Sequence, residues 1–133
     1  MLRRLVGRIA EIAKRRPKPV VVESMDDFDR LTIGALARAG ADLDRPAEIV
    51  FASYLPSDGA AGAFAEAARL ARYATTITPP DAHDPALSAA YCVLAKTVAI
   101  PSLDTVRAAR TFFTALAERH GGEYDGWFAE VVK

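Results

Sequence analysis

The order in which two hydrophobic periodicities follow one another constrains this chain more than any other feature. From residue 48 onward, segments typical of strands are separated by two segments whose apolar residues recur at helical spacing. The strand-like segments lie at 49–54, 73–78, 90–100 and 121–132, and the helical ones at 60–72 and 102–120. The predicted order is therefore strand, helix, strand, strand, helix, strand.

A chain with this order of elements folds most simply as an α+β, ferredoxin-like β-α-β-β-α-β sandwich, with a four-stranded antiparallel sheet. The right-handed crossover rule places both helices on one face of that sheet. One or two N-terminal helices are expected to precede the sandwich. Ser24 is predicted to cap the second of these, and Gly40 to end it. The apolar stripe of this helix comprises Phe28, Leu31, Leu36 and Ala39.

The size and composition of the chain are those of one globular domain. The chain has 133 residues, of which 51% are hydrophobic and 26% charged, so it can build one core. We divide it into a basic amphipathic helix with a proline linker at 1–19 and the sandwich domain at 20–133. No apolar run approaches the roughly 18 to 20 residues of a membrane-spanning helix. A single cysteine, Cys92, excludes an internal disulfide, so we expect a cytoplasmic protein.

Positive charge is concentrated at the N-terminus. Residues 1–18 carry seven basic side chains and one acidic one, whereas the remaining residues carry ten basic and sixteen acidic side chains. Three interpretations of the helix at 2–16 stay open: it docks on the domain or on a second copy, lies on an anionic membrane surface, or binds nucleic acid or an acidic partner. The composition also overlaps with that of mitochondrial presequences. The apolar stripe of this helix is Leu2, Leu5, Val6, Ile9, Ile12 and Ala13.

Few residues offer catalytic or metal-binding chemistry. Neither glycine-rich phosphate-binding pattern occurs, and Cys92 and His120 are interpreted as structural residues. Asp81, His83 and Asp84 form the one cluster with metal-ligand chemistry, and we interpret it as part of a surface loop. The sequence therefore predicts no enzyme, no metal site and no cofactor.

The C-terminal stretch 121–132 is the most distinctive in composition. Gly121 and Gly122 are expected to end a helix, and a closing strand follows in which Tyr124 and Trp127 occupy opposite phases of the alternation. This alternation would place a large aromatic side chain on each face of the sheet. Glu123 and Asp125 share one phase, so we expect an acidic patch on a solvent-exposed edge.

Two stretches carry a resemblance to a known family. They are Ala-Gly-Ala-Asp-Leu-Asp-Arg-Pro-Ala-Glu-Ile at 39–49 and Leu-Ala-Glu-Arg-His-Gly-Gly-Glu-Tyr-Asp-Gly-Trp at 116–127. Together they resemble the regulator of ribonuclease E activity B (RraB) domain family, over roughly residues 26–131. The resemblance implies a ferredoxin-like α+β fold and a non-catalytic bacterial protein that binds ribonuclease E and modulates RNA decay. The motif residues are Arg45, Pro46, Gly121, Gly122, Tyr124, Gly126 and Trp127.

We therefore predict a regulator that acts by binding another protein. Its acidic body would approach a basic segment of ribonuclease E or of another RNA-processing enzyme, with electrostatics steering the encounter. The predicted contact residues are Asp42, Asp44, Glu123 and Asp125. Direct nucleic-acid binding is disfavoured, because the domain is net acidic and lacks the signature of RNA-binding sheets. The alternative function is a membrane-surface or self-associating module driven by residues 2–16.

Overall fold

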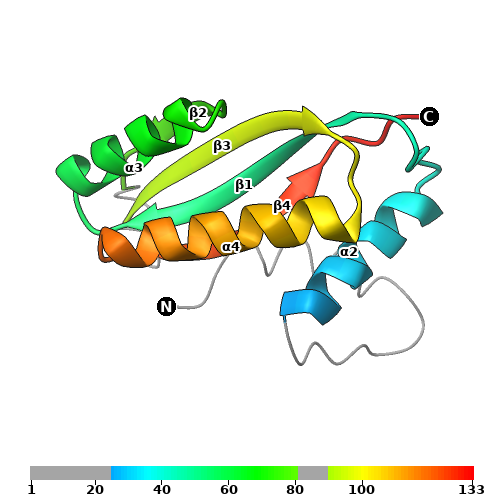
Figure 1. Cartoon of the computed structure of the whole chain (residues 1–133), viewed down its shortest axis with the longest axis horizontal. Helices are drawn as coiled ribbons and strands as arrows, with labels where there is room; N and C mark the ends of the chain where they lie inside the picture. Colours follow the sequence, from blue (N-terminus) through cyan, green and yellow to red (C-terminus); the bar gives the residue numbers. More distant parts are fainter. Residues whose placement is uncertain (1–24, 81–89) are drawn as a thin grey trace.

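A computed structural model of the chain describes residues 25–80 and 90–133. Within these ranges, α2 (Met25–Arg38) precedes the first strand (Figure 1). The other elements follow as β1 (Ala47–Leu55), α3 (Asp58–Leu70), β2 (Ala74–Thr78), β3 (Tyr91–Ala99), α4 (Leu103–Arg119) and β4 (Glu123–Ala129). The predicted β-α-β-β-α-β order is confirmed. The helix predicted at 2–16 lies outside the described residues.

The four strands form one sheet in the order β2-β3-β1-β4, and every neighbouring pair is antiparallel. β1 is central and pairs along its whole length with β3, from Ala47 opposite Ala99 to Leu55 opposite Tyr91. This strand order and direction confirm the predicted ferredoxin-like arrangement. β2 and β4 are the two edge strands.

Two helices cover one face of the sheet. α3 contacts β1, β2 and β3, while α4 contacts β1 and β4 (Figure 1). Each helix begins at a capping serine, because the Ser57 hydroxyl accepts from the amide of Ala60 and the Ser102 hydroxyl from that of Thr105. α2 extends this helical layer by packing beside α4.

The hydrophobic core lies between the sheet and these helices. Phe113 of α4 is fully buried and stacks on Phe51 of β1 and Phe64 of α3, with ring centroids 5.4 and 5.9 Å apart. Such pairs stabilise a core beyond the effect of their buried area. α2 contributes Phe28 and Leu36, whereas Leu31 is partly buried and Ala39, which follows the helix end, is exposed.

The alternation predicted for β4 is wrong at its centre. Ala52 of β1 lies opposite Gly126 while the adjacent Ser53 lies opposite Tyr124, so Asp125 is the extra residue of a β-bulge. Gly126 has a φ of 136°, which side-chain-bearing residues rarely adopt. The extra residue shifts the alternation by one. Tyr124 and Trp127 therefore both enter the core under the helices.

Candidate protein-binding surface

A polar cluster holds α2 against α4 and β4. The buried Asp29 carboxylate accepts a hydrogen bond from Trp127 Nε1 at 2.8 Å and forms an ion pair with Arg110 at 3.0 Å. Arg110 also pairs with Asp26 at 2.6 Å, and Arg107 pairs with Asp26 at 2.8 Å. Trp127 is therefore a structural residue. Sequence reasoning missed this cluster, although the i, i+3 spacing of Asp26 with Asp29 and of Arg107 with Arg110 places each pair on one helix face.

These contacts shift the pKa values of the two aspartates in opposite directions. Burial raises the pKa of Asp29, and the Trp127 hydrogen bond and the Arg110 charge offset only part of this rise. Hydrogen bonds from Arg107 and Arg110 hold the pKa of Asp26 well below its usual range. Burial thus disfavours the ionised form of Asp29, whereas the arginines favour the ionised form of Asp26.

The motif glycines Gly121 and Gly122 have roles in folding. Gly121 has a φ of 77°, and the Gly122 amide donates to the Ala117 carbonyl oxygen at 2.8 Å, so the two residues close α4 in a Schellman turn. A Cβ atom on Gly122 would lie 2.1 Å from the carbonyl oxygen of Tyr54. A side chain at this position would therefore displace the backbone of β1.

The connector between α2 and β1 carries the other motif residues, Arg45 and Pro46, with Asp42 and Asp44. All four are exposed. The Asp42 carboxylate accepts the Asp44 amide at 3.0 Å, which shapes a tight turn. Arg45 Nη1 donates to the carbonyl oxygen of Lys133 at 3.0 Å, so the connector lies beside the C-terminal residue.

The predicted contact residues occupy the two ends of the β1–β4 pair. Asp42 and Asp44 precede the start of β1, whereas Glu123 lies opposite Tyr54, close to the end of β1. A strand of nine residues spans about 30 Å. Asp42 and Asp44 therefore lie apart from Glu123 and do not form one patch with it.

The expectation that Asp125 lies on a solvent-exposed edge is wrong. Its exposed fraction is 0%, because the side chain belongs to the bulged residue in the middle of the β1–β4 pair. Burial, together with the nearby Asp125 carboxylate, raises the pKa of the Cys92 thiol to about 11. Cys92 is therefore protonated at neutral pH, which agrees with its interpretation as a structural residue.

The sheet face opposite α3 and α4, here called the open face, carries large apolar side chains. Val98 and Phe128 are exposed by 67% and 36%, whereas Ala52 and Tyr54 on the same face are buried. A shallow groove of about 240 Å³ crosses the middle of this face. Lys96 lies between Ala74 and Val50 in the row that crosses the sheet, and it forms an ion pair with Glu48 at 3.7 Å. Its lining residues are Glu48, Val50, Ala74, Thr76, Leu94, Lys96 and Phe128.

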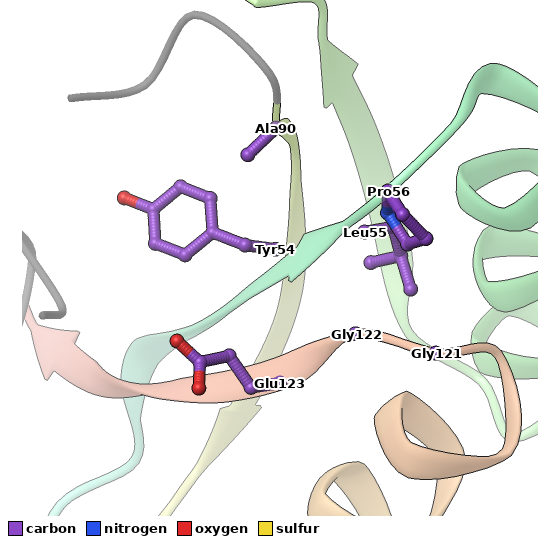
Figure 2. A pocket seen from close by; sticks show the side chains of 7 residues that line it. All are labelled: Tyr54, Leu55, Pro56, Ala90, Gly121, Gly122 and Glu123. Carbon is purple, nitrogen blue, oxygen red and sulfur yellow. The ribbon is translucent and has the colours of Figure 1, made fainter. Parts of the chain in front are cut away.

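A second hollow, of about 250 Å³, lies where β1 ends beside the start of β4. Figure 2 shows the Tyr54 ring and the Glu123 carboxylate projecting to the same side of the strands, away from Gly121 and Gly122. Leu55 and Pro56 supply apolar walls. A carboxylate next to an aromatic ring is an arrangement that attracts a cationic side chain.

The described ranges, 25–80 and 90–133, hold neither a candidate metal-binding group nor a membrane-spanning helix. No group of three histidine, cysteine, aspartate or glutamate residues in these ranges could hold a metal ion. The Asp81, His83 and Asp84 cluster falls outside them. Likewise, none of the described helices has the length and apolar character needed to cross a bilayer.

Comparison with known proteins identifies the family. The model of the family described as Regulator of ribonuclease activity B (RraB) matches residues 26–128, which run from the first turn of α2 to near the end of β4. No curated protein matches the chain. The matched range covers most of the chain and includes both stretches that carry the sequence resemblance. The chain therefore belongs to the RraB family.

Proposed function

We propose that this protein is a non-catalytic cytoplasmic regulator of bacterial RNA turnover that binds ribonuclease E or another RNA-processing enzyme. The match to a family of ribonuclease regulators, which extends over the whole sandwich, is the observation that carries this proposal. The binding surface consists of the open face together with the acidic residues at the two ends of the β1–β4 pair. These are Asp42 and Asp44 at one end and Glu123 at the other.

The open face has the chemistry of a protein-binding surface. Val50, Leu94 and Phe128 supply apolar surface in the groove, and this surface loses water when a partner binds. Asp42 and Asp44 at one end, and Glu123 at the other, supply negative charge that steers a basic segment toward the face. The partner segment therefore carries basic residues together with apolar ones. Asp125 has no accessible surface, so we omit it from the proposed contacts.

Copurification with the cell's ribonuclease E at low salt tests the proposed function. Charge reversal at the acidic positions, in Glu123→Lys and in the double variant Asp42→Lys with Asp44→Lys, is expected to weaken the association at least about tenfold, or 1.4 kcal/mol. The matched control is Glu118→Lys, which makes the same charge change at an exposed position on α4.

Each result has a distinct meaning. Failure of the unmodified protein to associate with ribonuclease E or with another RNA-processing enzyme at low salt would refute the proposed function. An equal loss in Glu118→Lys would mean that net charge, and not the open face, determines the association.

A further inference from the structure

The open face offers an apolar surface of the size that an amphipathic helix covers. Val98 and Phe128 are exposed, whereas Val50, which lies opposite Phe128, and Leu94, which lies opposite Ala52, are partly buried. A helix of fifteen residues is about 22 Å long. It therefore fits within the roughly 30 Å that a nine-residue strand such as β1 provides.

The charges of the open face complement those of residues 2–16. Glu48 and Glu123 lie on this face, and Lys96 is its one cation among the residues that the structure describes. The N-terminal segment is the most basic part of the chain, with seven basic side chains and one acidic one in residues 1–18. A basic helix with an apolar stripe matches both properties of the face.

The start of α2 lies close enough for these residues to reach the open face. Asp26 is held by Arg107 and Arg110, and Asp29 is bonded to Trp127 on the edge strand β4. The eight residues at 17–24 span up to about 26 Å when extended. A path round the β4 edge crosses a single sheet layer, and layers pack about 10 Å apart.

We propose that residues 2–16 dock as an amphipathic helix on the open face of their own chain. The stripe that contains Leu5 and Ile9 packs on Val50, Leu94 and Phe128, and the basic side chains face Glu48 and Glu123. The chain's own basic segment then occupies the surface that a basic partner segment would use, and the two compete. This docking requires no ribonuclease, so it is tested on the isolated protein.

Nuclear magnetic resonance with a spin label tests the docking in the full chain. The label is attached at Ala10→Cys, next to the apolar stripe, in a Cys92→Ser background. The methyl signals of Val50, Leu94 and Val98 are expected to lose more intensity than those of Val106 and Leu116, which lie on α4 on the other side of the sheet. Adding Ile9→Asp is expected to restore the lost intensity. Gly7→Asp adds the same charge away from the stripe and is expected to leave the loss in place.

Three results would overturn the proposal. The first is full open-face intensity in the labelled chain. The second is broadening that appears only when spin-labelled and isotope-labelled copies are mixed, with a doubled mass, because the occupant is then a second copy. The third is a loss of open-face intensity that persists in the Ile9→Asp variant, together with binding of residues 2–16 to anionic vesicles, because the helix then lies on a membrane surface.

Discussion

The two faces of the sheet differ in how fully folding explains their residues, and adjacent residues of β4 show the difference. Trp127 faces the helices, is 0% exposed and donates its indole N–H to Asp29. Phe128 faces the other way and is 36% exposed. Most large side chains on the covered face belong to the core, whereas Val98 and Phe128 on the open face are exposed. The open face is therefore where we place the binding function.

Charged groups follow the same division. Asp29 is buried and has two partners, so removing either partner leaves a polar group unsatisfied. The Lys96–Glu48 pair on the open face is about half exposed on both sides, and such pairs contribute at most about 1 kcal/mol. Asp29 thus depends on its partners in the folded protein, whereas the Lys96–Glu48 pair contributes little to stability.

The largest expected effect compares Trp127 with Phe128 directly. Trp127→Ala removes a fully buried side chain and the donor to Asp29, so it is expected to cost about 3 to 5 kcal/mol. Phe128→Ala is expected to cost less than about 1 kcal/mol. Urea unfolding of both variants measures the two free energies. Equal losses of unfolding free energy would mean that Trp127 and Phe128 contribute equally to stability, so that the two faces do not differ in packing.

A substitution at Gly122, the residue before β4, tests how closely β4 and β1 approach each other. Gly122→Ala brings a methyl group against the Tyr54 carbonyl oxygen, so it is expected to cost about 1 to 3 kcal/mol of unfolding free energy. Gly59→Ala is the matched control, because no atom lies within 4 Å of its added Cβ, and a gain of up to about 1 kcal/mol is expected there. Unfolding by urea measures both, and a stable Gly122→Ala protein would contradict the close approach.

The raised pKa of Asp29 predicts that the stability of the folded protein depends on pH. Because its folded-state pKa is raised, the folded chain binds the proton more tightly than the unfolded chain. This stabilisation is present at low pH and is lost as the pH rises through the folded pKa. The Asp29→Asn variant lacks this dependence. The stability of the parent is therefore expected to fall relative to that of Asp29→Asn as the pH rises above the ordinary aspartate pKa of about 3.9.

Urea midpoints of the parent and of Asp29→Asn at each pH provide the measurement. Asp26 has a lowered pKa, so its stabilisation is lost on acidification, with the opposite sign. Both proteins contain Asp26, so the sign of their difference reports the titration of Asp29. A parent that gains stability relative to the variant as the pH rises would reverse the assigned direction.

The smallest expected effect on stability is on the open face. Val98→Thr keeps the shape of an exposed side chain, so the free energy of unfolding is expected to change by no more than about 0.5 kcal/mol. Copurification with the ribonuclease is expected to weaken several-fold, because apolar contact is lost. Leu70→Thr on α3, where Leu70 is 79% exposed, is the control and is expected to leave copurification unchanged. An equal change in copurification for Val98→Thr and Leu70→Thr would mean that the open face does not bind the ribonuclease.

Local patterns in the sequence were sufficient for the order of elements. Strand alternation, helical stripes, the capping Ser57 and Ser102, and the terminating Gly40 and Gly121 all act within a few residues of chain. The positions of β1, α3, β2, β3, α4 and β4 therefore follow from the sequence. The family resemblance could also be stated from its motifs, and the family match confirms it.

Only the tertiary structure decided which side of each strand is covered and where the candidate surface lies. The bulge at Asp125 reverses the alternation of β4, and it depends on the register with β1, more than 70 positions earlier. The bond between Trp127 and Asp29 joins residues 98 positions apart. Neither contact leaves a local periodicity, because each depends on which segments become neighbours when the chain folds. For that reason the sequence indicated Asp125 as an exposed contact, whereas the fold buries it fully and leaves Glu123, on the open face, partly buried.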